Sequence, residues 1–297
     1  MLNNINIIGC GYIGKKIARL LIARDISSSC FVKSEISKET CLEINVPAKL
    51  FNLDKEGLEL NKSQLKEFDK SILAYLAPPQ RNGLTDERMA NFISALEAVD
   101  AVPHKVVLIS TTGVYGDCKG EWIDESRIAL PKADRAHRRL DAEKQLIEYC
   151  EKNNVQYIVF RVPGIYAPDK LPVKRITSGE PIVRAADSGY TNRIHADDLS
   201  ALCVEALLCE ISSGIYNCCD GQPSTMNDYF TQVADALGYP RPQEISLSKA
   251  RQTLSEGMLS YLAESKRISN KKLRCHFKTE FKYPSLKEGL KEGLKSL

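Results

Sequence analysis

The chain has 297 residues, of which 43% are hydrophobic and 27% are charged, and its formal net charge is +3. A chain of this length buries about three quarters of its unfolded surface, so it needs no disulfide or metal ion to fold. The composition excludes a disordered chain, and the balanced charge gives no reason to expect a nucleic-acid or membrane partner.

Ten cysteines are scattered along the chain, and no two of them form a C-x-x-C pair. The adjacent Cys218 and Cys219 do not have the spacing of metal ligands either. The chain has no signal-peptide pattern, and no stretch approaches the roughly 20 apolar residues of a membrane span. We therefore expect free thiols, no metal site and a cytoplasmic location.

Short apolar runs alternate with longer mixed segments over the first two thirds of the chain. The predicted strands are Ile5–Ile8, Ser29–Val32, Lys49–Leu53, Ser71–Leu76, Lys105–Ile109 and Gln156–Arg161. Segments between several of them place apolar residues at helical spacing, most clearly Arg88–Val99 and Leu140–Tyr149. This alternation predicts a parallel sheet covered by helices on both faces.

The pattern changes after Arg161, where prolines mark an irregular stretch. Helices are then predicted over Asp198–Cys209 and Asn227–Leu237, with a short strand at Ile215–Cys218 between them. The tail from Pro240 onward is expected to be mainly helical.

These elements predict the α/β class, with a Rossmann-type doubly wound parallel sheet and a smaller, mainly helical C-terminal lobe. We assign residues 1–165 to the sheet domain and residues 166–297 to the lobe on the substrate side. Elements from about 192–220 are expected to return to the sheet. The alternative is that the C-terminal third only extends a single domain.

A glycine-rich turn follows the first predicted strand. The segment Gly9-Cys10-Gly11-Tyr12-Ile13-Gly14 has the pattern G-x-G-x-x-G and leads into a helix over Lys15–Arg24. In dinucleotide-binding proteins the first glycine makes the tight turn, the second lets the backbone approach the pyrophosphate, and the third lets the helix pack closely. The helix N-terminus also offers N–H groups to the phosphates. We assign a cofactor-binding role to Gly9, Gly11, Tyr12, Ile13 and Gly14; the alternative is a purely structural turn.

The end of the second strand bears on which dinucleotide is bound. An NAD site expects a carboxylate that accepts the ribose 2′-hydroxyl, but here the strand ends in Lys33-Ser34. A lysine and a serine suit a 2′-phosphate, so the predicted cofactor is NADP(H), with NAD(H) as the second choice. The alternative is that Lys33 is a solvated loop lysine and the cofactor is NAD.

Several further motifs, taken in order, resemble the extended short-chain dehydrogenase/reductase superfamily, in its NAD-dependent epimerase/dehydratase group. They are Ala77-Pro78-Pro79, Thr111-Thr112-Gly113-Val114-Tyr115-Gly116, Arg161-Val162-Pro163-Gly164-Ile165-Tyr166, Asn192-Arg193-Ile194-His195 and Asp220-Gly221-Gln222-Pro223. Together with the glycine turn they cover nearly the whole chain. The resemblance implies cofactor contacts from Leu53, Ala77, Pro78, Ser110 and Pro163. It also implies substrate contacts from Thr112, Tyr115, Tyr166 and Arg193.

The resemblance implies catalytic residues that this chain has only in part. Members of the family use a Ser or Thr after the fifth strand and Tyr-x-x-x-Lys on the next helix, with the tyrosine as general acid/base. Thr111 stands at the hydroxyl position, but Arg135 and Arg139 replace the tyrosine and the lysine. An arginine stays charged and cannot act as the base. We take Thr111, Arg135 and Arg139 as catalytic candidates; the alternative for the arginines is a solvated basic helix face.

Tyr115, Tyr166 and Tyr190 are the remaining candidates for a substitute acid. His195 more often has a structural role in such a position, hydrogen-bonded to backbone. Nucleotide-sugar epimerases commonly have an arginine four residues before this histidine to bind the substrate diphosphate, where this chain has Thr191. The resemblance therefore argues against a nucleotide-sugar substrate.

The predicted function is that of an epimerase/dehydratase-like or reductase-like enzyme of the atypical extended type. It would act with NAD(P) on a small polar carbonyl or hydroxyl compound, as a monomer or homodimer. The alternative is a non-catalytic NADP(H)-binding sensor or regulatory protein, which the missing Tyr-x-x-x-Lys favours.

Overall fold

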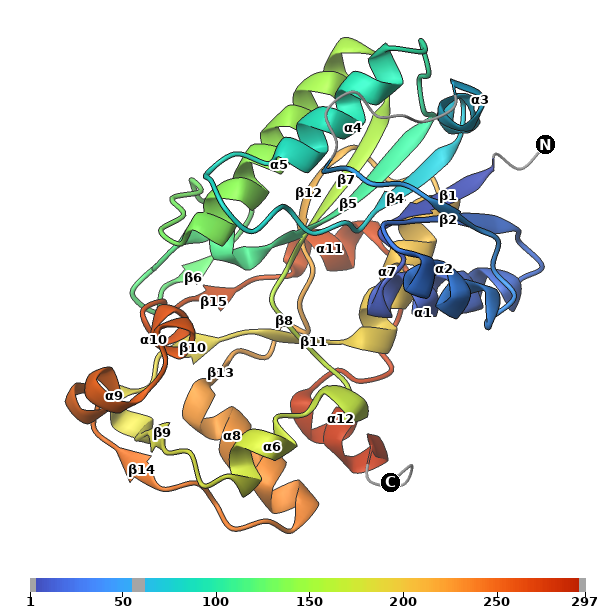
Figure 1. Ribbon diagram of the computed structural model, residues 1–297. Coiled ribbons are helices and arrows are strands. Elements are labelled where there is room, and N and C mark those ends of the chain that lie inside the picture. Colours follow the sequence, from blue (N-terminus) through green and yellow to red (C-terminus); the bar gives the residue numbers. More distant parts are fainter. Residues whose placement is uncertain (1–3, 55–61, 294–297) are drawn as a thin grey trace.

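A parallel sheet forms the centre of the computed structural model, which describes residues 4–54 and 62–293 (Figure 1). Its strands run in the order β12-β7-β5-β4-β1-β2-β3, and all neighbours are parallel. Their bounds are β1 (Ile5–Ile8), β2 (Ser28–Val32), β3 (Ala48–Leu50), β4 (Ile72–Tyr75), β5 (Lys105–Thr111), β7 (Gln156–Val162) and β12 (Gly214–Asn217). The apolar runs of the sequence therefore became the buried centre of an α/β fold, as predicted.

Helices cover both faces of this sheet (Figure 1). One face carries α1 (Tyr12–Ile22), α2 (Glu35–Leu42) and α7 (Ala196–Leu208), and the other carries α4 (Glu87–Glu97) and α5 (Asp134–Lys152). Each face has its own buried apolar cluster, one around Ile17 and Leu202, the other around Phe92 and Leu146. The doubly wound Rossmann-type prediction is thus confirmed.

The rest of the chain forms a smaller, mainly helical lobe beside the carboxyl ends of the central strands (Figure 1). Its helices are α6 (Val173–Thr177), α8 (Met226–Leu237), α9 (Leu247–Thr253), α10 (Glu256–Leu262) and α12 (Leu286–Gly293). Short strands pair within or next to it: β8 (Gly164–Tyr166) with β11 (Arg193–His195), β9 (Ile182–Val183) with β14 (Glu244–Ile245), β10 (Tyr190–Thr191) with β13 (Ser224–Thr225), and β6 (Trp122–Ile123) with β15 (Arg267–Ile268). Helix α11 (Lys271–His276) and the short α3 (Lys62–Leu65) complete the α-helices of the described residues.

The main difference from the predicted bounds is in α5. The apolar spacing predicted a helix from Leu140, whereas α5 begins at Asp134. Its first turns consist mostly of charged residues, so hydrophobic periodicity does not detect them. These turns carry Arg135 and Arg139, and the helix therefore presents both arginines from a regular backbone.

Segments from the second half of the chain return to the central sheet. Strand β12 pairs with β7, and α7 packs against α1. How the chain divides into domains stays a prediction, and its outermost residues, 1–3 and 294–297, lie outside the described part. Among the described residues, no helix combines the length and apolar character needed to span a bilayer.

Candidate active site

The loops after the carboxyl ends of the central strands form the candidate site. In the strand order β3-β2-β1-β4-β5, β2 and β3 are added on one side of β1, and β4 and β5 are added on its other side. Ligands of open α/β sheets bind at such a switch point, outside the carboxyl ends of the strands. The glycine turn follows β1, and Lys33 and Ser34 follow β2. Ala77 and Pro78 follow β4, so several predicted cofactor residues meet at this edge.

The three glycines of the turn have different surroundings. Gly9 has a φ of +84°, and a Cβ atom there would lie 2.5 Å from the backbone nitrogen of Ala77. At Gly14 a Cβ would lie 3.3 Å from side-chain atoms of Ile7, Cys10 and Leu76. At Gly11, in contrast, a Cβ would meet no protein atom within 4 Å. Gly9 is thus required by its φ and its backbone contact, and Gly14 lets α1 pack closely, whereas Gly11 leaves space that is open to a ligand.

The start of α1 is suited to an anion. Gly11 is the N-cap residue and provides no capping side chain, and the first turn contains no acidic residue. The N–H groups of that turn are therefore left for a ligand, at the positive end of the helix dipole. Tyr12 is the first residue of α1, and its hydroxyl donates to Asp169 Oδ1 at 2.6 Å. Asp169 belongs to a short 3-10 helix of the lobe, η3 (Pro168–Lys170), so this contact joins the lobe to the turn.

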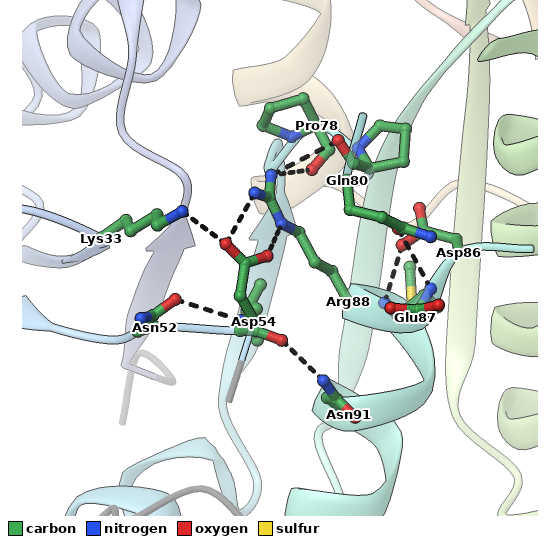
Figure 2. A network of polar contacts seen from close by, with 12 residues as sticks. Lys33, Asn52, Asp54, Pro78, Gln80, Asp86, Glu87, Arg88 and Asn91 are labelled. Atoms are coloured by element: carbon green, nitrogen blue, oxygen red, sulfur yellow. Dashed lines mark hydrogen bonds and ion pairs between the residues drawn. The ribbon is translucent and has the colours of Figure 1, made fainter. Parts of the chain in front are cut away.

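Charged side chains meet at the tips of β2 and β3 (Figure 2). The ammonium group of Lys33 pairs with the carboxylate of Asp54. Arg88, in the first turn of α4, holds the same carboxylate with two of its nitrogens, one of them 3.0 Å from Oδ2. These hydrogen bonds, from Arg88 first and then Lys33, lower the pKa of Asp54 to about 2. A charged carboxylate is therefore shared between two cations at this end of the site.

A cavity of about 400 Å³ lies beside these ion pairs. It is lined by Lys33, Asp54 and Arg88 together with Leu53, Gln80, Arg81 and Glu87. Arg88 also donates to the carbonyl oxygen of Pro78 at 2.7 Å, which fixes the guanidinium against the loop after β4 (Figure 2). The Ser34 hydroxyl accepts from the Ser37 N–H and caps α2. The Ser34 hydroxyl is therefore already used as the N-cap of α2. Lys33 and Arg88 are the cations at this cavity that form ion pairs, both with Asp54.

Sequence reasoning missed Asp54 and Arg88. They stand 21 and 55 residues after Lys33, in different elements, and only the parallel sheet brings them together. A usable signal was present, because Asp54 follows the β3 run in the way that Lys33 follows β2.

Thr111 and Arg139 lie at the end of β5 and on α5. The Thr111 hydroxyl accepts from the Gly113 N–H at 3.2 Å, which leaves its own O–H free to donate. The Arg139 guanidinium donates to the carbonyl oxygen of Ala77 at 3.1 Å and so joins α5 to the loop after β4. Burial lowers the pKa of Arg139 from its ordinary value, but an arginine remains charged in proteins.

Arg135 is exposed and contacts the lobe. Its guanidinium donates to the Ser260 hydroxyl at 2.9 Å and lies 4.6 Å from the ring centroid of Tyr261. Both partners belong to α10. The position that the resemblance assigns to the catalytic tyrosine is therefore filled by a cation that joins the sheet domain to the lobe.

A buried polar network lies behind Thr111. Glu143 of α5 accepts from the Ser110 hydroxyl and pairs with Arg161 of β7 at 2.7 Å. The Arg161 guanidinium lies 4.7 Å from the ring centroid of Tyr115, whose hydroxyl donates to Asn217 Oδ1 at 2.7 Å. Burial raises the pKa of Tyr115 to about 12. Ser110 and Tyr115 thus have defined internal partners, and their roles toward cofactor and substrate stay predictions.

The remaining substrate candidates are in the lobe. Tyr166 is 2% exposed and donates to the carbonyl oxygen of Ser285 at 3.1 Å. Arg193 is buried, stacks at 3.6 Å on the Tyr229 ring, and lines a cavity of about 630 Å³ between β11, α8 and α12. Thr112 is buried and begins the short 3-10 helix that follows β5. Of the four predicted substrate residues, Arg193 is the one that lines this cavity.

Pro163 and His195 occupy junctions between elements. Pro163 is half-buried between β7 and β8. His195 caps α7, because its Nδ1 atom accepts from the Asp197 N–H at 3.2 Å. A structural role for His195 therefore agrees with this geometry.

Comparisons with known proteins agree with this arrangement. Residues 5–219 match the model of the NAD dependent epimerase/dehydratase family. Protein YeeZ of Escherichia coli (strain K12) is 24% identical over 248 residues, which are 82% of this chain and 86% of that protein.

Two solved structures illustrate the likeness in fold. A functionally unknown conserved protein from Silicibacter pomeroyi has a TM-score of 0.83 at 24% identity, over 99% of each chain. The UDP-glucose 4-epimerase of Thermus thermophilus, in complex with NAD, has a TM-score of 0.74 at 20% identity, over 98% of each chain.

Proposed function

This chain belongs to the NAD-dependent epimerase/dehydratase family, and on that premise we propose that it binds NADP(H) across the carboxyl ends of β1 to β5. With the bound dinucleotide it would oxidise or reduce a small polar carbonyl or hydroxyl compound. The observation that supports this most is the open space at Gly11, beside an uncapped helix start with no acidic residue.

The residues of the turn fit a dinucleotide. A pyrophosphate needs close approach of the backbone and unpaired N–H groups. Gly11 leaves the space, and the N–H groups of Tyr12 and Ile13 open the first turn of α1 without a capping side chain. Gly9 and Gly14 hold the turn against β4 and β1. The pyrophosphate would lie at the start of α1, with the adenosine directed toward the tips of β2 and β3.

The choice of NADP(H) rests on the cations around the 400 Å³ cavity. Lys33 uses one of its three donors on Asp54, and Arg88 adds a second cation that the sequence analysis did not foresee. A 2′-phosphate would compete with Asp54 for these two groups. NAD(H) is the alternative cofactor, with the Asp54 carboxylate as acceptor of the ribose 2′-hydroxyl. The Thermus epimerase of similar fold is in complex with NAD.

Calorimetric titration with NADP⁺ and with NAD⁺ distinguishes the two. Hydrogen bonds to charged groups contribute about 1.5–3 kcal/mol, and exposure favours the lower end. We therefore expect NADP⁺ to bind on the order of tenfold more tightly than NAD⁺. Lys33→Asp should reverse this preference, and added salt should reduce it.

Two further variants make this test specific. Lys33→Gln removes one cation without adding a carboxylate and leaves Arg88, so it should reduce the preference for NADP⁺ without reversing it. Asp54→Asn releases both cations and should strengthen NADP⁺ binding. Tighter binding of NAD⁺ by the unmodified chain, lost in Asp54→Asn, would contradict the proposal and assign the ribose contact to Asp54.

The chemistry would take place beside Thr111. A bound nicotinamide supplies or accepts the hydride. The free O–H of Thr111 would orient the substrate oxygen, and the charges of Arg135 and Arg139 would stabilise negative charge that develops on it. None of these three groups exchanges a proton at neutral pH, so a general acid/base is not among them.

A non-catalytic NADP(H) sensor is the second candidate. Its support is the engagement of Arg135 by Ser260 and Tyr261, where the family has a catalytic tyrosine. A panel of small aldehydes, ketones and alcohols, followed by the absorbance of NADPH, separates the two functions. If the protein turns over a compound of the panel and Thr111→Val abolishes this turnover, the enzyme is supported. If it binds NADP(H) tightly but turns over no compound of the panel, the sensor is supported.

A further inference from the structure

Three cysteines from separate elements meet under the glycine turn. Cys10 stands between Gly9 and Gly11, Cys30 lies in β2, and Cys41 lies in the last turn of α2. Their Sγ atoms all lie within 4.8 Å of one another. The residues are 3%, 0% and 0% exposed, respectively. Among the described residues this is the one group of three potential metal ligands at such distances.

We propose that Cys10, Cys30 and Cys41 form a trithiolate site for a soft monovalent cation, Cu(I), directly beneath the dinucleotide turn. This goes beyond the proposed function, which does not use these residues. It also departs from the expectation of no metal site, which rested on spacing along the sequence.

The distances suit one ion bound to three sulfurs. Metal–sulfur bonds at thiolate sites are about 2.3 Å long. Three sulfurs around an ion in one plane therefore lie about 4.0 Å apart. The present separation of at most 4.8 Å would have to close by less than about 1 Å, which side-chain rotation and small backbone shifts can provide.

The number and type of ligands select the ion. Thiolates are soft ligands that prefer Cu(I) and zinc over hard cations. Zinc in structural sites is almost always bound by four ligands, whereas this group offers three. The surroundings are apolar, with Ile7, Ile17 and Val46 in the same buried cluster, so water is poorly placed to become a fourth ligand. A cation that accepts three sulfurs fits this site best.

The electrostatic setting favours a thiolate at Cys10. This residue directly precedes Gly11, the N-cap of α1, and the positive end of a helix dipole stabilises an adjacent thiolate.

Metal binding would also affect the turn itself. The Cys10 Sγ atom already lies 3.3 Å from where a Cβ of Gly14 would be. An ion on Cys10 would fix the turn to β2 and α2 at the point where the dinucleotide is expected. This consequence rests on the proposed function, whereas the metal site itself does not.

The test is anaerobic titration of the reduced full chain with Cu(I), in competition with a chromophoric Cu(I) chelator. The exposed Cys209 and Cys275 are first replaced by serine, because surface thiols bind copper adventitiously. We expect this protein to bind one Cu(I) per chain. Cys41→Ser, which leaves the turn unchanged, should abolish that binding. Cys203→Ser, which removes an equally buried thiol outside this group of three, should retain it.

X-ray absorption of the copper-loaded protein decides the matter even if a variant fails to fold. Three sulfur neighbours support the proposal. Nitrogen or oxygen neighbours, or undiminished copper binding by Cys41→Ser, would overturn it. Neither readout involves a dinucleotide, so failure here is distinguishable from failure of the proposed function.

Discussion

The two ends of the candidate site are built differently. At the tips of β2 and β3 the charges are partly exposed, with the side chains of Asp54 and Arg88 at 32% and 17% exposure. Behind Thr111 the charges are buried, with Arg161 and Glu143 at 5% and 2%. The charged side chains of the first group can exchange their partners for a ligand at little cost in free energy. Arg161 and Glu143 cannot, because a buried charge would lose its partner. The two ends should therefore respond differently when one charged partner is removed.

The difference has a physical basis in desolvation. An exposed ion pair contributes about 0–1 kcal/mol to stability, because water solvates its partners when it opens. Removing one partner of a buried pair costs about 3–5 kcal/mol, because the other charge stays uncompensated. The following variants test this contrast, in decreasing order of effect.

The largest effects are expected from the glycine turn. Gly9→Val forces a Cβ to within 2.5 Å of the Ala77 backbone at a φ of +84°. It should destabilise the protein by more than about 4 kcal/mol, measured by urea denaturation. Gly11→Val meets no protein atom within 4 Å, so it should fold and yet show no measurable dinucleotide binding in calorimetry. Unchanged affinity in Gly11→Val would remove the pyrophosphate from this turn.

The buried network should respond more strongly than the exposed one. Glu143→Ala leaves Arg161 buried without its carboxylate and should lower the free energy of unfolding by about 3–5 kcal/mol. Asp54→Asn is the matched control at the exposed end and should change it by about 1 kcal/mol at most. Similar losses in the two variants would contradict the contrast between the two ends.

Restoring the tyrosine and lysine of the family tests the end of the site near Thr111. Arg135→Tyr together with Arg139→Lys supplies a phenol and an ammonium on α5, next to Thr111. If the site is otherwise intact, hydride transfer to a substrate from the carbonyl panel should increase by at least about 10²-fold. Arg135→Phe with Arg139→Lys lacks only the hydroxyl and should show no increase. An equal rate in both double variants would show that the phenol is not in reach of the substrate.

The smallest effect concerns pH. The pKa of Asp54 is lowered to about 2 by Arg88 and Lys33, so the folded state binds its proton less readily than the unfolded chain, whose pKa is about 3.9. The stabilisation by Asp54 is therefore fully present above about pH 4 and is lost as the pH falls toward 2. The difference in melting temperature between the wild type and Asp54→Asn should shrink over that interval. A difference that stays constant would mean that the ion pairs of Asp54 do not persist in solution.

The sequence predicted the elements whose signal is local. The glycine turn, the strands and the alternation of helices depend on residues within one segment, and the fold confirmed them. The start of α5 was missed because Arg135 and its neighbours carry no apolar period. Asp54, Arg88 and the three cysteines were missed because their contacts join residues more than ten positions apart. Such contacts depend on sheet order, which spacing along one chain does not encode.

A crystal structure of the protein with NADP⁺ is the decisive measurement for the proposed dinucleotide site. We expect the pyrophosphate at the start of α1 next to Gly11, and the 2′-phosphate at ion-pairing distance from Lys33 and Arg88, with Asp54 displaced from at least one of them. A dinucleotide bound there with its ribose hydroxyls on the Asp54 carboxylate, and its 2′-phosphate directed into solvent, would contradict this assignment.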